Sequence, residues 1–217
     1  MNDVKCPKCS KEYENIAFHW SQKSSHRPGF TSFQREVICG LIMGDGYVST
    51  QSKNPYLDVS MTNKKYLQYL DSIFGIFSLG VNKHRDSSDF NDEYNHKDVY
   101  RFRSRTHPEI KIFEDWYSTG EKIFPEDIPL SPTVLRHWYV GDGNLYDNRD
   151  IRICSTNEIK NKKKLTNMFE RHGLPEPDYW YEKEGTNYMA WRKDNSKFLF
   201  EYMQMGVPGF DYKFEVN

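Results

Sequence analysis

The chain has 217 residues, which is enough for one large domain or two smaller ones with a real hydrophobic core. Hydrophobic residues make up 37% and aromatic residues 16%, a composition that excludes an intrinsically disordered chain. The formal net charge of -1 does not by itself indicate a nucleic-acid-binding protein. No apolar run is long enough to cross a membrane, and the N-terminus lacks the apolar core of a secretory signal. We therefore expect an intracellular protein, in the cytoplasm or nucleoid, whose cysteines are metal ligands or buried thiols.

Residues 1–30 are predicted to form a small zinc module. The spacing C-x2-C-x9-H-x6-H suits four ligands of a tetrahedral zinc ion, namely Cys6, Cys9, His19 and His26. The segment is too short to bury a core of its own, so metal would have to hold it folded. A disordered cysteine-containing tail is the alternative. Cys39 and Cys154 lie in apolar segments and are expected to be buried thiols.

Hydrophobic periodicity and turn residues then predict alternating helices and strand pairs. The first half is expected to contain a helix from residue 31, two strands within 47–61, a helix over 63–78, two strands within 81–105 and a helix near 108–117. The second half is expected to contain a helix from residue 131, strands at 144–148 and 150–155, a helix over 158–172, strands within 178–192 and a helix over 194–205.

The two halves are predicted to be copies of one unit. Gly-Asp-Gly at 44–46 recurs 97 residues later at 141–143, and Thr62-Asn63 recurs 94 residues later at 156–157. Two such copies are expected to pair about a pseudo-two-fold axis. We assign residues 31–125 to the first repeat and residues 126–217 to the second.

Each Gly-Asp-Gly is predicted to end an apolar helix. Ser32 is expected to cap the first helix, and Ser131 with Pro132 gives a strong start signal for the second. Gly46 and Gly143 are expected to end the two helices. Gly40 and Gly44 lie on one helix face, where small residues let two helices approach closely.

The two motifs would bring Asp45 and Asp142 together if the helices pack side by side. Two carboxylates in one place are unfavourable unless a cation neutralises them, and oxygen ligands suit Mg²⁺. Such metals would activate water for phosphodiester cleavage. The alternative is that each Gly-Asp-Gly is only a turn after a helix.

GLIMGDGYV and HWYVGDGNL resemble the two LAGLIDADG motifs of single-chain homing endonucleases. The resemblance implies an α+β fold of two αββαββα repeats, packed through the two motif helices, with antiparallel sheets forming a DNA-binding saddle. It also implies a monomer that cuts both strands of a long double-stranded DNA site, with Asp45 and Asp142 holding Mg²⁺ (roughly two or three ions). Arg136 and His137 depart from the small residues expected in the second helix, and Gly precedes each Asp.

The same family often has a lysine near the active site at the end of each half, and Lys122 and Lys213 match by position. Each would orient the hydrolytic water or stabilise charge in the transition state. Two solvated surface lysines are the alternative.

Basic residues on the predicted strands are candidates for contacts with DNA. Strand periodicity puts Arg101, Arg103 and Arg105 on one face. The other candidates are Lys83 and Arg85 in the first half and Arg149, Arg152, Lys183, Arg192 and Lys193 in the second. Basic strands on one side and acids elsewhere would reconcile DNA binding with the near-neutral charge.

The leading hypothesis is therefore a site-specific DNA endonuclease, free-standing or intron-encoded, because the chain lacks the splice residues of an intein. A non-catalytic DNA- or RNA-binding protein on the same scaffold, such as an intron maturase or a transcription regulator, is the second hypothesis. A third is an unrelated two-repeat α/β protein without DNA affinity. Two carboxylates, one from each repeat, favour the first.

Overall fold

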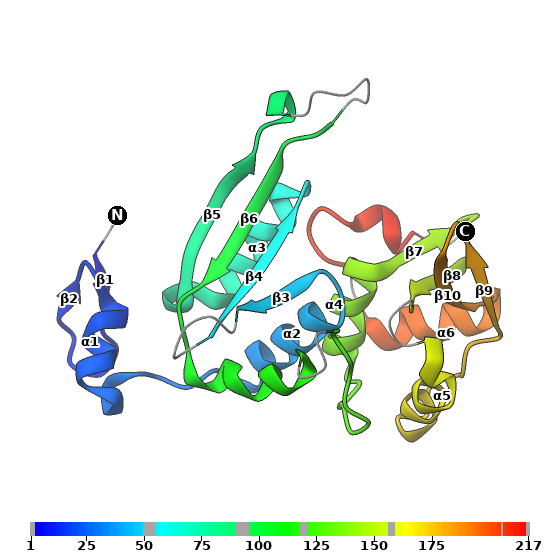
Figure 1. The fold of residues 1–217 in the computed structure, drawn as a ribbon, viewed down its shortest axis with the longest axis horizontal. Coiled ribbons are helices and arrows are strands. Elements are labelled where there is room, and N and C mark those ends of the chain that lie inside the picture. The colour runs from blue at the N-terminus through cyan, green and yellow to red at the C-terminus, as the bar shows by residue number, and fades with distance from the viewer. Residues whose placement is uncertain are drawn as a thin grey trace.

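A computed structural model describes residues 3–49, 55–89, 96–117, 121–155, 159–204 and 206–215 (Figure 1). The fold is α+β: two similar units of helices and antiparallel strands follow a small N-terminal module. The second Thr-Asn pair, at 156–157, lies outside the described residues. Within the described ranges, no helix combines the length and the hydrophobicity needed to cross a bilayer.

The first unit has the predicted order of elements. Its elements are α2 (Ser32–Met43), β3 (Gly46–Ser49), β4 (Tyr56–Met61), α3 (Lys64–Phe74), β5 (Ser78–Arg85), β6 (Val99–Ser104) and a 3-10 helix, η4 (Pro108–Tyr117). The strands form an antiparallel sheet in the order β3-β4-β6-β5, and α3 packs against it. The last predicted helix is thus a 3-10 helix rather than an α-helix.

The second unit repeats this arrangement. Its elements are α4 (Pro132–Asp142), β7 (Gly143–Tyr146), β8 (Asp150–Cys154), α5 (Lys162–Arg171), β9 (Tyr179–Lys183), β10 (Thr186–Trp191) and α6 (Lys193–Met203). The sheet order β7-β8-β10-β9 matches that of the first unit strand for strand. The internal repeat predicted from the two Gly-Asp-Gly motifs is therefore confirmed.

The two units meet through α2 and α4, which pack closely along their lengths. A Cβ added at Gly40 would overlap the carbonyl oxygen of Val134 and lie 2.8 Å from the Cβ of His137. The absence of a side chain at Gly40 is what accommodates the bulky His137 on the facing helix. His137 is buried, and its Nδ1 lies 2.5 Å from the Tyr66 hydroxyl of the first unit. The second motif helix therefore packs tightly despite its large residue.

The ends of the helices and strands correct three expectations. Thr31, not Ser32, caps α2, because its side chain accepts from the Gln34 backbone while the Gln34 side chain accepts from Thr31, forming a capping box. Gly46 belongs to β3, since α2 ends at Met43 with Gly44 as its cap. Asp45 therefore lies just beyond its helix. Cys154 is only partly buried, because β8 ends there at the edge of a hollow.

Other predicted signals hold. Ser131 caps α4 through the backbone N–H of Val134, and Pro132 occupies the first turn. Gly143 caps the end of α4, and Cys39 is buried as expected.

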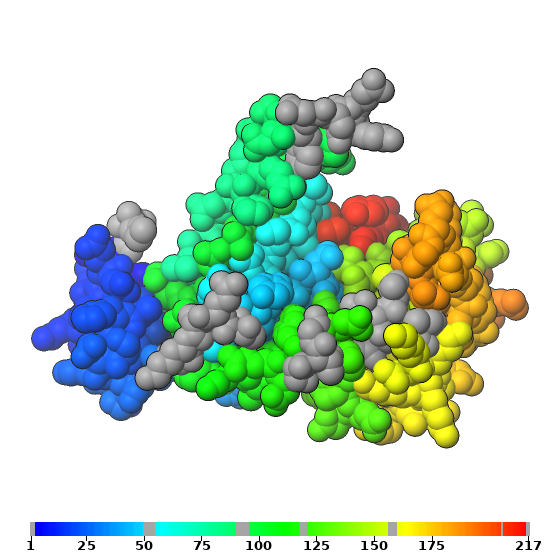
Figure 2. Space-filling model, in the orientation of Figure 1, coloured from blue at the N-terminus to red at the C-terminus, as the bar shows by residue number. Residues whose placement is uncertain are grey.

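The N-terminal module packs on the first unit and forms a lobe at one end of the molecule (Figure 2). It consists of β1 (Val4–Lys5), β2 (Glu12–Tyr13) and α1 (Ile16–Gln22). The Trp20 ring is almost fully buried and lies 5.9 Å from the ring of Phe77, the residue before β5. The His107 Nε2 lies 3.0 Å from the Pro28 carbonyl oxygen, which fixes the segment after the module.

We expect Gly40→Ala to lower the free energy of unfolding by about 1–3 kcal/mol, because the new methyl group would press into the α4 backbone. Urea unfolding would measure the change. Ser32→Ala, on the exposed first turn of the same helix, is the control and should change stability by less than about 0.5 kcal/mol. An unchanged midpoint for Gly40→Ala would contradict close packing of the two helices.

Candidate active site

The ends of α2 and α4 are held together by two glycines. A Cβ added at Gly44 would lie 3.2 Å from the Gly141 Cα, and one added at Gly141 would lie 2.7 Å from the backbone nitrogen of Asp45. The backbones of the two motifs therefore touch immediately before the two aspartates. This approach brings Asp45 and Asp142 into one site, as the sequence predicts.

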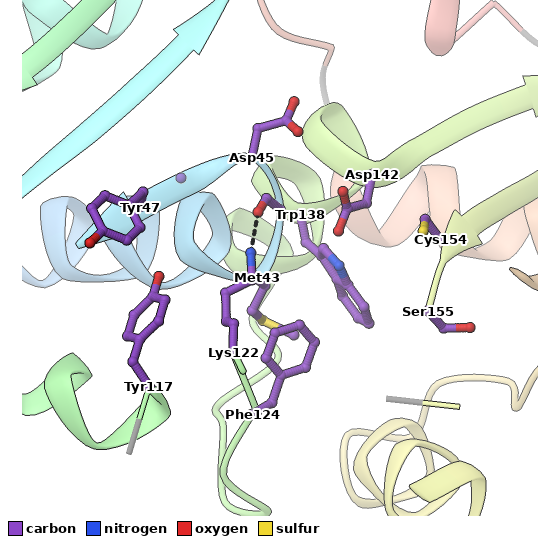
Figure 3. Close-up of a pocket in the computed structure, with 12 residues that line it drawn as sticks. Met43, Asp45, Tyr47, Tyr117, Lys122, Phe124, Trp138, Asp142, Cys154 and Ser155 are labelled. Carbon is purple, nitrogen blue, oxygen red and sulfur yellow. Dashed lines mark hydrogen bonds between the residues drawn. The ribbon is translucent and has the colours of Figure 1, made fainter. Parts of the chain in front are cut away.

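Both aspartates border a hollow of about 450 Å³ (Figure 3). Its wall includes Lys122 from the first repeat and Ser155, just after β8, from the second. The side chains of Tyr47, Tyr117, Phe124, Trp138 and Cys154 also line it. Trp138 Nε1 is buried and makes no hydrogen bond of normal geometry, but its proximity to Asp142 slightly lowers the pKa of that carboxyl.

A second hollow, of about 520 Å³, also borders Asp45. It is lined by Thr62, just after β4 of the first repeat, and by Lys213 of the second. The first hollow likewise combines the end of β8 from one repeat with Lys122 from the other. The two hollows are thus equivalent parts of the two repeats, each with one lysine.

The two lysines hold the C-terminal ends of the two motif helices. Lys122 Nζ donates to the Gly44 carbonyl at 2.5 Å. Lys213 Nζ donates to the carbonyls of Val140 at 2.7 Å and Gly143 at 2.6 Å. A cation at a helix C-terminus offsets the partial negative charge of the free carbonyls there. The lysines are therefore not solvated surface groups, and Lys213 is buried.

Burial and mutual repulsion raise the pKa values of the acids. Burial raises the pKa of Asp142 to about 6, with the Asp45 carboxylate adding to the rise and Lys122 opposing it. Partial dehydration also raises the pKa of Asp45, although this residue is open to solvent, and Lys213 opposes that rise more than Lys122 does. Each carboxylate therefore interacts more strongly with the lysine of the other repeat.

The pKa values of the two lysines are lowered. Burial lowers the pKa of Lys213 to about 8, against the attraction of Asp45 and then Asp142. Burial also lowers the pKa of Lys122, against the same two carboxylates in reverse order. An added cation would relieve the repulsion between the two ionised carboxylates.

The arginines of β6 converge on one buried acid. Arg101 Nε donates to both carboxylate oxygens of Asp58 at 2.7 Å, and Arg103 reaches the same carboxylate at 3.3 Å. Arg105 departs from the predicted stripe because β6 ends at Ser104. Its Nε instead donates to the Ile76 carbonyl at 3.1 Å, close to the N-terminal module.

The β5 candidates lie on different faces. The register pairs Arg85 with Val99, on the same face as Arg101, but pairs Lys83 with Tyr100 on the other face. Lys83 Nζ forms salt bridges with Asp86 and Asp98 at 2.9 and 2.7 Å. The structure therefore does not join Lys83 to the arginines. Between β5 and β6 the structure describes residues 86–89 and 96–98.

The second-repeat candidates form one group and two separate residues. Arg149, Arg192 and Lys193 border one hollow together with Tyr179, and Arg149 also pairs with Asp150. Arg152 lies apart on β8, over the ring of Tyr146. Lys183 is exposed at the end of β9 and also lies outside this group.

The four predicted ligands of the N-terminal module come together. The ligand atoms of Cys6, Cys9, His19 and His26 all lie within 4.8 Å of one another. Cys9 Sγ is 3.7 Å from His19 Nε2, which is 3.2 Å from His26 Nδ1. The backbone N–H of Lys11 is the main cause that lowers the pKa of Cys9 to about 6, favouring the thiolate that binds metals. This cluster could hold a metal ion.

Sequence reasoning missed several residues of these sites. Asp58 alternates with apolar residues on β4, so strand periodicity could have put it on the arginine face. Trp138 and Tyr117 gave no such signal, because aromatic residues of this chain are common in its core. Their role at the hollow depends on how the helices cross.

Comparison with known proteins shows the family of the chain. Residues 35–175 match the LAGLIDADG DNA endonuclease family, which is well over half of the sequence. The chain belongs to this family. Its LAGLIDADG helices are α2 and α4, and the matched segment contains both Gly-Asp-Gly motifs.

Two solved structures share the fold of this LAGLIDADG protein over most of its length. The homing endonuclease I-WcaI, solved bound to its DNA recognition sequence, superposes with a TM-score of 0.78 over 94% of each chain at 16% identity. I-DmoI, solved with DNA and Mn, gives 0.50 over 81% of this chain and 99% of that one at 13% identity. The uncharacterized protein MJ1098 of Methanocaldococcus jannaschii is 30% identical over 128 residues, which are 51% of this chain and 43% of that protein.

We expect Asp142→Asn to be more stable than the wild type at pH 7 when no divalent cation is added. The pKa of Asp142 is raised on folding, so the wild type loses stability as the pH rises from about 4 to about 6. The full shift corresponds to ~3 kcal/mol, and partial exposure reduces the expected difference to about 1–2 kcal/mol.

Urea unfolding of both proteins at several pH values between 4 and 7 would measure this difference. Asp127→Asn, an exposed linker residue, is the control. A difference that does not change between pH 4 and pH 7 would show that Asp142 titrates normally.

Proposed function

We propose that this protein is a site-specific homing endonuclease that cuts both strands of double-stranded DNA. The supporting observation is the contact of α2 with α4, which brings one carboxylate from each repeat to a site with two lysines. Relatives of the same fold that were solved on DNA, I-WcaI and I-DmoI, agree with this proposal.

Asp45 and Asp142 are proposed to hold Mg²⁺. The donor set fits: the two carboxylates repel each other and border open hollows, which leaves room for the water ligands that Mg²⁺ retains. When bound, Mg²⁺ would lower the pKa of a water nucleophile and stabilise the leaving oxygen. The aspartates themselves orient this site, because their backbones are fixed by the glycine contact.

Lys122 and Lys213 are proposed to act on the charge that develops at phosphorus. Each ammonium is anchored to carbonyls at a helix end, so its position is set before DNA binds. Preorganised donors of this kind stabilise a transition state without reorganising. Their lowered pKa values also permit proton transfer with a bound water, most readily for Lys213.

One hollow per lysine suits two phosphodiesters, one on each strand. The first hollow contains Lys122 and borders both aspartates, whereas the second contains Lys213 and borders Asp45. Because the two hollows come from equivalent elements, one would serve each strand. This correspondence favours a double-strand cut over a single nick.

The outer faces of the two sheets are proposed to bind DNA. Arg85, Arg101 and Arg103 share one face of the first sheet, and Arg152 lies on the corresponding face of the second. Arg149, Arg192 and Lys193 gather at a hollow beside β9, where they would contact phosphates.

The N-terminal Cys/His cluster is proposed to bind zinc. With Zn–N near 2.0 Å and Zn–S near 2.3 Å, tetrahedral ligand atoms are roughly 3.3–3.8 Å apart. The observed distances of 3.2 and 3.7 Å agree with this geometry. Zinc would then stabilise a module that has little core of its own and that packs on the first repeat through Trp20.

We expect Asp45→Asn and Asp142→Asn each to lower the rate of DNA cleavage about hundredfold or more, with binding changed only a few-fold, because a ligand of the activating metal is lost. A duplex selected from a randomised double-stranded library by the wild type is the substrate, with and without Mg²⁺. Asp127→Asn is the charge-matched control and should cut as the wild type does.

The outcome separates the alternatives. A wild type that binds its selected duplex but never cuts it would indicate a non-catalytic DNA-binding protein on this scaffold. A wild type that selects no duplex would contradict the proposed function altogether.

We expect the purified protein to contain one equivalent of zinc, and Cys9→Ser to lose it, because three ligands hold zinc far less tightly at a structural site. Elemental mass spectrometry would measure the content, and amide hydrogen exchange over residues 3–26 should accelerate in the variant. Cys154→Ser, outside the cluster, should retain zinc. Zinc retained in Cys9→Ser would refute the assignment.

A further inference from the structure

Equivalent positions on the two sheets have opposite charges. In the first repeat Tyr47, two residues after Asp45, pairs with Asp58. In the second repeat Asn144, two residues after Asp142, pairs with Arg152. The strand registers therefore make Asp58 and Arg152 counterparts, close in sequence and sheet to the two proposed metal ligands. The neighbours on each strand point into the core, so both side chains belong to the outer face.

Arg152 is held by aromatic rings rather than by an acid. Its guanidinium carbon lies 3.3 Å from the centre of the Tyr146 ring and 5.1 Å from that of Tyr181. The Tyr181 ring in turn stacks on Tyr188 at 5.1 Å. No carboxylate in the described part of the chain pairs with Arg152, and its buried Nε makes no hydrogen bond. The flat face of this guanidinium is thus covered by the Tyr146 ring, and its proximity to the Tyr181 hydroxyl opposes the rise that burial causes in the pKa of Tyr181.

In the first repeat the equivalent residue, Asp58, is an acid that pairs with arginines. It is 5% exposed and receives hydrogen bonds from both Arg101 and Arg103 on the adjacent strand. The Arg103 guanidinium also lies 4.8 Å from the ring of Tyr56. The strand register places Tyr188 and Ala190 where the first repeat has Arg101 and Arg103. The second sheet therefore has one arginine where the first has an acid, and no arginine where the first has two.

We propose that Arg152, oriented by Tyr146 and Tyr181, recognises a guanine in the half of the DNA target bound by the second repeat. Asp58 is the corresponding positioning residue of the first repeat, where it orients Arg101 and Arg103. This inference rests on the proposed function and adds the residues that would determine base preference near the centre of the target.

Guanine fits the geometry better than the other bases. It presents two acceptors, O6 and N7, in the major groove, and the planar edge of a guanidinium matches both at once. Stacking on tyrosine limits the rotation of the guanidinium, so less side-chain entropy is lost when it binds. A phosphate contact would need no such orientation, and it would not depend on the base.

The test compares base preferences of variants. Double-stranded DNA with randomised sequence is selected by the wild type, and preference at each position of the selected duplex is then measured. Arg152→Gln should lower the preference for guanine about ten- to hundredfold at one position in one half-site. Asp58→Asn should change preferences only in the other half-site.

Paired variants separate positioning from simple packing. Tyr146 is half exposed, so its replacement should leave the fold intact. Tyr146→Phe keeps the ring and should retain the wild-type preference, whereas Tyr146→Leu should reproduce most of the loss seen in Arg152→Gln. Lys197→Gln removes an exposed positive charge from α6, away from the proposed DNA-binding faces, and is the control that should leave base preference unchanged.

The possible outcomes of these experiments distinguish base recognition from other roles of Arg152. Equal weakening on all duplexes by Arg152→Gln would show a phosphate contact and overturn the inference. A wild-type preference in Tyr146→Leu would overturn the positioning role of the tyrosine. A wild type that binds and cuts a selected site while these variants keep its preferences would overturn the inference alone, whereas a wild type that selects nothing would also remove the proposed function.

Discussion

The close contact between α2 and α4 determines the rest of this molecule. Gly40 accepts the bulk of His137, and Gly44 meets the backbone of Gly141 directly before the two aspartates. Two carboxylates near the negative ends of two helices are unfavourable together. The lysines that donate to the carbonyls of these same helix ends offset part of that cost, and a divalent cation would offset the remainder.

The buried charged groups of this site lower the stability of the folded protein. Asp142 resists ionisation and Lys213 resists protonation, because both are surrounded by protein. A protein optimised only for stability would have neutral side chains there. The charged groups at the junction of the two repeats instead fit the proposed binding of a cation and a polyanion. The same junction also determines where the two sheets lie, since β3 and β7 follow directly from the aspartates.

The two repeats share a backbone plan but differ in the chemistry of their outer faces. Buried Asp58 organises the arginines of the first sheet, whereas tyrosines organise the single central arginine of the second. The chain as a whole is nearly neutral, yet it can still have basic surfaces. Some of its acids, such as Asp58, are buried and paired with arginines. The N-terminal Cys/His module adds a third surface, joined to the first repeat by Trp20.

The sequence alone determined the repeat, the order of its elements and the pairing of Asp45 with Asp142, because helix and strand periods and the recurring Gly-Asp-Gly are local signals. It also predicted the Cys/His cluster from spacing. The tertiary structure decided which residues meet across the fold: Asp58 with two arginines, Lys83 with two acids, Arg105 with a backbone carbonyl. Strand register and the exact ends of helices set these contacts, and a shift of one residue reverses the face of every side chain. The cap at Thr31 and the end of β6 at Ser104 were such one-residue differences, which periodicity cannot resolve.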